Sequence, residues 1–332
     1  MIAVAERQIH DFREHFLRVR EEIGRVIVGN EDIVSGVMAC LLVRGHVLLE
    51  GIPGVGKTKL VQTMADVLHL KFSRIQFTPD LMPGDIVGTN IVREDAAGRK
   101  AFEFQRGPIF ANMVLADEIN RATPKTQSAL LEAMQENSVT AAGQTHTLDQ
   151  PFFVLATQNP IEMEGTYPLP EAQMDRFLYK LKLDFPDEKQ LHAIVNRTTQ
   201  SKEPEVKRVL EQGQILEMRE IARAVPIAVP VQDYAIRITL ALHPETAQAH
   251  EMAKRFVRFG PSPRGAQALI LGAKVNALIN NRVYVAGEDI RAVALPALRH
   301  RVLLNFEAEA ERIDTDRIVR QVLESVAEPA GG

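Results

Sequence analysis

The sequence predicts an α/β domain with a five-stranded, mostly parallel sheet, followed by a smaller all-helical domain. Two observations indicate the sheet. Short apolar segments alternate with helical patterns, and the first of them leads into a glycine-rich turn and a helix, the order that opens a βαβ unit. The third observation is that strand patterns stop near residue 189 and helical spacing takes over.

The first elements are a helix, a strand and a second helix. The N-terminal helix, assigned to residues 1–27, has an apolar stripe at three- and four-residue steps: Ile9, Phe12, Phe16, Val19, Ile23 and Val26. Val47–Leu49 is predicted as a short buried strand. After the glycine-rich turn, one helical face is apolar: Leu60, Val61, Met64, Val67 and Leu68.

Four further apolar segments complete the predicted sheet: Phe72–Phe77, Met113–Ala116, Phe152–Ala156 and Tyr179–Leu183. The last alternates apolar residues with Lys180 and Lys182, as expected of an edge strand with one side toward water. A helix before the fourth strand begins with Thr123 as its cap and Pro124 at its first position.

Two insertions and a helical region lie outside the minimal domain. Ile86–Phe104 and Ser138–Leu148 have the pattern of β-hairpins, turning near residues 95–98 and at Ala142-Gly143. The polar stretch 196–207 contains the expected boundary, which divides the chain into residues 1–200 and 201–332. Helices are predicted in the second part at Ile215–Ala224, Val231–Leu242, Ser262–Asn280 and Glu288–Arg299.

Composition excludes some classes of protein. With 39 basic and 43 acidic residues the net charge is −4, which provides no global field to attract a phosphate backbone and disfavours a nucleic-acid partner. No apolar stretch approaches the roughly 20 residues of a membrane span, and no signal peptide is visible, so a cytoplasmic protein is expected. The single cysteine, Cys40, is expected to fill the core.

The glycine-rich turn carries the clearest chemical pattern. Gly51-Ile52-Pro53-Gly54-Val55-Gly56-Lys57-Thr58 fits G-x-x-x-x-G-K-[ST] between a predicted strand and a predicted helix. Glycines let the backbone N–H groups approach phosphate, Lys57 reaches the β- and γ-phosphates, and the Thr58 hydroxyl is a ligand for Mg²⁺. The sequence therefore predicts a P-loop that binds ATP with Mg²⁺.

Two carboxylates follow the strand Met113–Ala116. Because ligands bind at the carboxyl ends of parallel strands, Asp117 can join the magnesium shell and Glu118 can polarise the attacking water.

Three further polar residues are candidates, each with a structural alternative. Asn159 ends another strand and can orient water or hold the γ-phosphate, or it can simply form an Asn-Pro turn. Arg176 lies before the edge strand, where it can serve a neighbour's nucleotide or belong to an Asp-Arg surface feature. Arg264 lies in the first turn of a predicted helix, after Ser262 and Pro263. A cation there opposes the helix dipole and needs an anion nearby. That anion can be the ATP phosphate when the helical domain closes over the nucleotide, or it can be a local acidic group.

The order of these motifs resembles that of the AAA+ superfamily of P-loop NTPases, and their amino-acid sequences are similar to those of MoxR-family ATPases. The resemblance is densest over residues 28–184, and it is carried by these segments: Leu115–Arg121, Lys125–Met134, Ala156–Pro160, Glu164–Ala172 and Ser262–Arg264.

The resemblance implies roles for single residues. Lys57 and Thr58 would be Walker A, Asp117 and Glu118 Walker B, Asn159 sensor 1, Arg176 the arginine finger and Arg264 sensor 2, while Val28 and Gly29 would lie near adenine. The hairpins would be the helix-2 and pre-sensor-1 inserts, and the helical domain would be the lid. Family members form rings, usually hexamers, and act as chaperone-like motors on partner proteins, often ones with von Willebrand factor A domains.

The leading interpretation is an ATP-driven motor that remodels a client or adaptor protein. Three alternatives stay open: a nucleotide-gated binding scaffold, a metal-chelatase motor subunit and a nucleic-acid motor. The scaffold would use about one ATP per binding event. A nucleic-acid motor would respond to single-stranded DNA in a salt-sensitive way. The hairpin tip Thr140–His146 carries no lysine or arginine, whereas Arg99 and Lys100 lie on the other hairpin.

Overall fold

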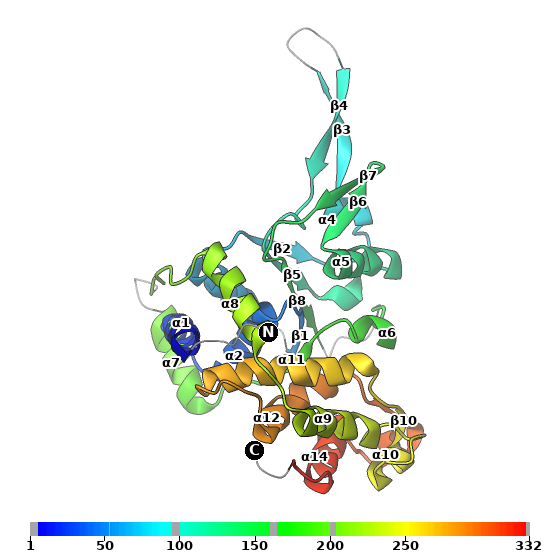
Figure 1. The fold of residues 1–332 in the computed structure, drawn as a ribbon. Helices are drawn as coiled ribbons and strands as arrows, with labels where there is room; N and C mark the ends of the chain where they lie inside the picture. The colour runs from blue at the N-terminus through cyan, green and yellow to red at the C-terminus, as the bar shows by residue number, and fades with distance from the viewer. Residues whose placement is uncertain (1–5, 53, 95–99, 160–164, 200–203, 330–332) are drawn as a thin grey trace.

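A five-stranded parallel sheet is the centre of the computed structural model, which describes residues 6–52, 54–94, 100–159, 165–199 and 204–329. The strand order is β2-β5-β8-β1-β9. Their bounds are β1 (Val47–Gly51), β2 (Phe72–Gln76), β5 (Met113–Asp117), β8 (Phe153–Gln158) and β9 (Tyr179–Leu183). The five predicted strands and the edge position of β9 are therefore confirmed. Figure 1 shows the sheet between two hairpins above and a group of helices below.

The position of β1 sets the place of a ligand site. β1 pairs in register with β8 on one side and with β9 on the other, so Val47 lies opposite both Leu155 and Tyr179. The carboxyl ends of β1, β5 and β8 thus meet at one end of the sheet, called here the carboxyl end, and the opposite end is the amino end. The chain order reverses at β1, and open α/β sheets bind ligands at such a point.

The core has two layers because successive side chains of a strand point to opposite faces. Leu49, Leu115 and Leu155 pack on one face with the helices α1 (Glu6–Gly24), α2 (Glu31–Leu42) and α3 (Lys57–Val67). Leu48, Val114 and Val154 pack on the other face with α5 (Pro124–Glu136). Cys40 is buried in the first layer, as expected of a core residue. Thr123 occupies the N-cap position of α5, although its hydroxyl does not bond to a backbone N–H.

Both predicted hairpins are present. β3 (Gly88–Glu94) pairs with β4 (Lys100–Arg106), and β6 (Ser138–Ala141) pairs with β7 (Gln144–Thr147). The β3–β4 hairpin projects away from the sheet (Figure 1). Phe104 stacks on His146 with ring centroids 4.2 Å apart, which joins the bases of the two hairpins. The predicted turn at residues 95–98, and Arg99, lie outside the described residues.

The first hairpin begins later than predicted. Residues Ile86 and Val87 end a short helix, α4 (Pro83–Val87), instead of opening a strand. Pro83 suits the first helical position, and the Asp85 carboxylate accepts a hydrogen bond from the Met82 N–H at 2.8 Å.

The C-terminal region is mainly helical, as predicted, with one correction. Val257–Phe259 (β10) and Leu303–Leu304 (β11) form a short antiparallel ladder, so the region is not all-helical. Its helices are α7 (Glu188–Thr198), α8 (Gln212–Ala224), α9 (Val229–Ala241), α10 (Glu251–Phe256), α11 (Pro263–Ile279), α12 (Gly287–Leu298), α13 (Phe306–Ala310) and α14 (Thr315–Ser325).

The side of β9 that was expected to face water carries ion pairs instead. Lys180 pairs with Glu50 on β1 at 2.5 Å, and Lys182 pairs with Asp316 on α14 at 3.5 Å. The helical region therefore covers part of the edge strand.

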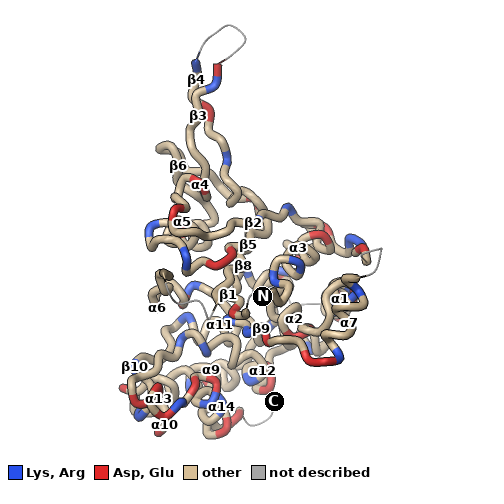
Figure 2. The backbone as a smooth tube through the Cα atoms, turned by 180° about the vertical axis from the view of Figure 1, so that it is seen from behind, with Lys and Arg blue, Asp and Glu red and all other residues tan. Residues whose placement is uncertain are grey.

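Contacts between the two predicted domains are extensive. One apolar cluster runs without a break from α1 and α2 into α8 and α11, so the division at residue 200 stays a prediction. Figure 2 shows both acidic and basic residues on the outer helices and on the β3–β4 hairpin, whereas the sheet carries few of either. Among the described helices, none has the length and apolar content needed to cross a membrane.

Candidate active site

The glycine-rich turn joins the carboxyl end of β1 to the N-terminus of α3. Gly54 and Gly56 have φ angles of +82° and +83°, a region that residues with a Cβ rarely adopt. A Cβ built at either glycine would meet nothing within 4 Å, so the loop presents open backbone. Thr58 is the second residue of α3, whose N-terminus supplies further N–H groups at this point. Pro53 lies outside the described residues.

Lys57 is the first residue of α3, and its side chain lies against the glycine-rich turn that precedes it. Its side chain is 9% exposed, and Nζ donates a hydrogen bond to the Gly51 carbonyl at 2.7 Å. The ammonium group is therefore held at the carboxyl end of β1, where it can meet a phosphate.

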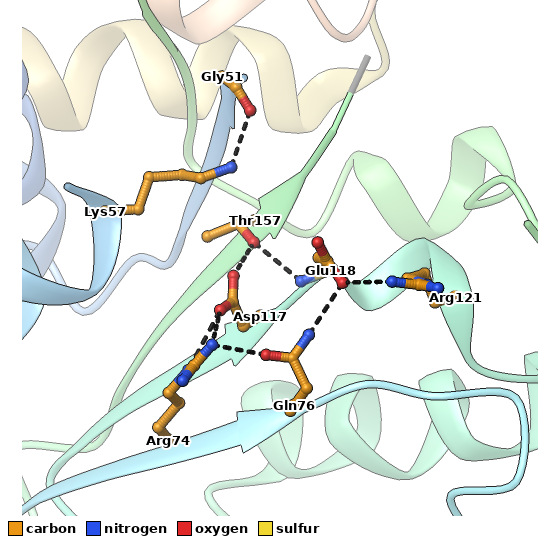
Figure 3. Close-up of polar contacts among 8 residues, drawn as sticks. All are labelled: Gly51, Lys57, Arg74, Gln76, Asp117, Glu118, Arg121 and Thr157. Atoms are coloured by element: carbon orange, nitrogen blue, oxygen red, sulfur yellow. Dashed lines mark hydrogen bonds and ion pairs between the residues drawn. The ribbon is translucent and has the colours of Figure 1, made fainter. Parts of the chain in front are cut away.

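The first carboxylate, Asp117, is the last residue of β5 and is only 8% exposed. Its Oδ2 accepts hydrogen bonds from Arg74 Nε and one terminal nitrogen at 3.1 and 2.7 Å. Its Oδ1 accepts from the Thr157 hydroxyl at 2.7 Å. Arg74 lies on β2 and Thr157 on β8, so both neighbouring strands orient this side chain (Figure 3).

The second carboxylate, Glu118, occupies a left-handed backbone conformation, with φ 57° and ψ 49°. Such a conformation costs free energy for a residue with a side chain and is concentrated at functional sites. The Glu118 N–H donates to the Thr157 hydroxyl at 2.8 Å. Its Oε2 accepts from Gln76 Nε2 at 2.9 Å and from Arg121 at 3.0 Å (Figure 3). These contacts fix the direction in which the carboxylate points.

The neighbouring strands and helices determine where three further candidates lie: Asn159, Val28 and Gly29. Asn159 directly follows β8, is 4% exposed, and lies between the ends of β5 and β1 because β8 separates those strands. Val28 and Gly29 connect α1 to α2. Gly29 has a φ of +67°, a region that residues with a Cβ rarely adopt, and its backbone lies against the Gln190 side chain on α7.

The two predicted arginines lie at the other end of the sheet. Arg176 and Arg264 line one cavity of about 190 Å³, together with Arg44, His46 and Arg301 among others. His46 directly precedes β1, which places this cavity at the amino end. Arg176 donates to the Leu131 carbonyl at 2.8 Å, and Arg264 is exposed at the start of α11.

The structure therefore brings the candidates together as two groups. A five-residue strand spans roughly 15 Å, and β1 separates Lys57 and Asp117 from the arginines. Arg264 does not lie over the P-loop of its own chain, so a lid closed over that chain's nucleotide is not the arrangement observed.

The residues at the carboxyl end fit a nucleoside triphosphate and Mg²⁺. The open glycine backbone and the buried ammonium group suit phosphate, and the Thr58 hydroxyl and Asp117 carboxylate offer oxygen atoms of the kind that Mg²⁺ prefers. Among the described residues, no group of three or more His, Cys, Asp or Glu side chains could hold a metal ion. Mg²⁺ is typically bound by one or two carboxylates together with substrate phosphates, so a dedicated cage is not required.

Sequence reasoning missed the residues that orient the acidic pair. Arg74 and Gln76 lie within the predicted strand Phe72–Phe77, and Thr157 directly follows the predicted strand Phe152–Ala156, but the sequence patterns predicted a role for none of the three. A signal did exist for Thr157, because a polar residue that follows a buried apolar strand at the carboxyl end of a parallel sheet is a candidate for the ligand site.

Comparisons with known proteins agree with this arrangement. Residues 46–179 match the model of the ATPase family associated with various cellular activities (AAA), and residues 249–322 match the AAA lid domain.

Similar proteins are found in several bacteria. The chain is 44% identical to Chaperone MoxR1 of Mycobacterium tuberculosis, over 93% of this chain and 81% of that protein. It is 30% identical to Protein MoxR of Methylorubrum extorquens, over 98% of both chains. The crystal structure of a putative ATPase from Cytophaga hutchinsonii superposes with a TM-score of 0.91 at 41% identity and covers 97% of each chain.

Proposed function

This chain belongs to the MoxR family of AAA+ ATPases, and from that membership we propose that it hydrolyses ATP at the seam between neighbouring subunits of a ring. The ring, which we take to be a hexamer, uses this reaction to remodel a client or adaptor protein.

One observation carries the proposal: the groups needed for hydrolysis are divided between opposite ends of one sheet. The P-loop, Asp117 and Glu118 are at the carboxyl end, whereas Arg176 and Arg264 share a cavity at the amino end. A single subunit cannot bring these two groups together, because the length of its own strands separates them. A neighbour whose amino end faces this carboxyl end would supply both arginines.

Each residue then has a defined task. The P-loop N–H groups and Lys57 bind the β- and γ-phosphates, and Thr58 and Asp117 hold Mg²⁺. Mg²⁺ held by these two residues would supply positive charge that neutralises the phosphate oxygens. Glu118 accepts a hydrogen bond from the attacking water and orients it, and Asn159 fixes the γ-phosphate beside it. Arg176 and Arg264 of the neighbour stabilise the charge that develops on the transferred group.

Two features support a protein rather than a nucleic acid as the client. The β6–β7 hairpin has no lysine or arginine, and the β3–β4 hairpin mixes both signs of charge (Figure 2). Across β3 and β4, the paired residues Val92 and Phe102 are 57% and 79% exposed. Exposed apolar pairs suit an apolar segment of a protein. A relative named as a chaperone points in the same direction, and a client with a von Willebrand factor A domain is proposed from the family alone.

The first test separates binding from hydrolysis. Lys57→Ala should lose Mg²⁺-ATP binding, because the loop then lacks its buried cation. Glu118→Gln should bind ATP normally and hydrolyse it about 100-fold or more slowly, since a general base typically contributes 10²- to 10⁴-fold. Fluorescent-nucleotide titration and phosphate release measure the two properties. Normal turnover by Glu118→Gln would remove Glu118 from the mechanism.

The second test addresses the seam. Arg176→Ala should lower kcat by roughly 10³-fold, because an arginine finger contributes 10³ or more. Mixing Arg176→Ala with Glu118→Gln subunits should restore activity, since a Glu118→Gln neighbour supplies its intact arginine to a complete P-loop. Arg18→Ala, an exposed arginine on α1, is the matched control. A fully active monomer, or no rescue on mixing, would contradict hydrolysis between subunits.

A further inference from the structure

The segment Asp175–Leu178, which carries Arg176, is held from the helical region by one buried arginine. Arg301 follows α12 and is 6% exposed. Its Nε donates to Asp175 Oδ1 at 2.7 Å, and its terminal nitrogens donate to the carbonyls of Asp175, Phe177 and Leu178 at 3.0, 2.7 and 3.0 Å. The remaining bond goes to the Ala297 carbonyl. A guanidinium has five N–H donors, so all are used, four of them on this segment.

A second residue of the helical region reinforces the contact. His300 Nε2 lies 3.0 Å from the Phe177 carbonyl. Burial lowers the pKa of His300 well below its usual value, so the ring is neutral and Nε2 carries the proton that it donates. The carbonyl next to Arg176 thus accepts hydrogen bonds from both His300 and Arg301.

The same aspartate reaches the helix that carries the second arginine. Asp175 Oδ2 accepts a hydrogen bond from the Ser262 hydroxyl at 2.8 Å. The Ser262 oxygen in turn accepts from the Arg264 N–H at 3.1 Å, as the N-cap of α11. One carboxylate therefore links the Arg176 segment to the first turn of α11, and Figure 1 shows α6 (Glu171–Met174) beside that end of α11.

We propose that Asp175, Arg301 and Ser262 are positioning residues that hold Arg176 and Arg264 at a fixed separation, so that both reach a neighbour's triphosphate together. This inference rests on the proposed function. The competing role for this network is purely structural: it would only fasten the helical region to the sheet. The two roles differ in what they predict for the subunit's own nucleotide site, which lies at the other end of β1.

The decisive variant is Asp175→Asn, which keeps the size of the side chain and an oxygen for Ser262 but removes the charge that Arg301 faces. We expect kcat to fall about 10-fold or more, because the transition state loses well-placed cations, while the Kd for Mg²⁺-ATP stays within about threefold. Weakened ATP binding by this variant would indicate a general fold defect and would overturn the proposal.

Mixed rings give a readout that a fold defect would not produce. Asp175→Asn subunits should regain activity with Glu118→Gln subunits, whose arginines are correctly held and can serve the Asp175→Asn nucleotide site. They should gain nothing with Arg176→Ala subunits, because both variants then fail to supply arginines. Rescue by Arg176→Ala, or no rescue by Glu118→Gln, would overturn the positioning role.

Ser262 provides an independent variant if Asp175→Asn folds poorly. Ser262→Ala should lower kcat several-fold, and Ser262→Thr should restore it, because the hydroxyl returns. Arg255→Gln is the matched control: it breaks ion pairs with Glu307 and Glu311 within the helical region and leaves residues 175–178 untouched. Unchanged kcat in Ser262→Ala would overturn the link to α11.

Failure of this inference is distinguishable from failure of the proposed function. If Arg176→Ala is rescued by Glu118→Gln but Asp175→Asn is not, only the positioning role is lost. If neither is rescued, hydrolysis between subunits is itself contradicted.

Discussion

Thr157 shows how one small side chain can orient both carboxylate residues of the proposed site. Its hydroxyl donates to Asp117 and accepts the N–H of Glu118, so it links the end of β8 to the end of β5. The residue is fully buried, and no water can replace these bonds without rearrangement. It therefore holds Glu118 in its left-handed conformation, with the carboxylate directed by Gln76 and Arg121.

Thr157→Val should impair hydrolysis more than binding. Valine keeps the shape but leaves the Glu118 N–H without its acceptor, at a cost of about 1–3 kcal/mol, so kcat should fall about 10-fold or more. The Kd for Mg²⁺-ATP should change little, because the P-loop is intact. Steady-state ATPase assays and nucleotide titration check both, with Thr157→Ser as the hydroxyl-bearing control. Equal kcat for valine and threonine would show that Glu118 needs no such support.

At the scale of elements, the sheet could be predicted from sequence and the short pieces of the helical region could not. The central strands β1, β5 and β8 are apolar runs whose burial follows from local composition, and the edge strand β9 shows the alternation of a strand with one covered side. In contrast, β10 and β11 contain three and two residues and pair across more than 40 positions, so no local pattern marks them. The helix α4 was missed for a similar reason, because its cap depends on a single aspartate.

Close packing between α11 and β9 yields a second prediction. A Cβ at Gly272 would lie 1.7 Å from the hydroxyl oxygen of Tyr179, which is buried and has no hydrogen-bond partner among the described residues. Gly272→Ala should therefore lower the free energy of unfolding by about 1–3 kcal/mol, despite the better helix propensity of alanine. Denaturant unfolding of the isolated variant measures this.

The double variant Gly272→Ala with Tyr179→Phe tests the cause. Removing the hydroxyl opens the space, so most of the lost stability should return, whereas Tyr179→Phe alone should be nearly neutral. A double variant no more stable than Gly272→Ala would mean that the hydroxyl is not the obstacle.

At the scale of the whole molecule, two buried histidines make stability depend on pH. His46 accepts a hydrogen bond from the Val154 N–H at 3.0 Å and donates to the Met134 carbonyl at 3.1 Å, so it is neutral. Burial lowers its pKa from 6.5 to about 4, and His300 shifts in the same direction. Because the folded pKa is depressed, the unfolded chain binds protons first as pH falls.

The contribution of His46 to the free energy of unfolding should therefore be constant above pH 6.5. It should decrease by about 3 kcal/mol as the pH falls toward 4. Urea unfolding at a series of pH values measures the effect. His46→Gln, whose amide can still donate and accept, should flatten part of the slope. The same slope in both proteins would assign the pH dependence to other groups.

The candidate site was predictable as a set of residues and not as an arrangement. The P-loop and the acidic pair each follow a strand that sequence alone identifies, so their meeting at one end of the sheet follows from parallel topology. The position of Arg264 does not follow from local sequence, because it depends on how the helical region packs. Arg301 binds Asp175, which lies 126 positions earlier in the chain, and no residue near Arg301 in the sequence indicates that contact.

The opposed placement of the two groups also gives the subunit a direction. A contact between the carboxyl end of one sheet and the amino end of the next is head-to-tail, and such contacts continue until the row closes on itself. Under the proposed function, the subunit at one terminus of an open row has no neighbour to complete its site, so n subunits contain n − 1 competent sites. Closing the ring supplies the missing competent site. A ring with one contact broken would keep one inactive subunit, which binds its nucleotide but does not hydrolyse it.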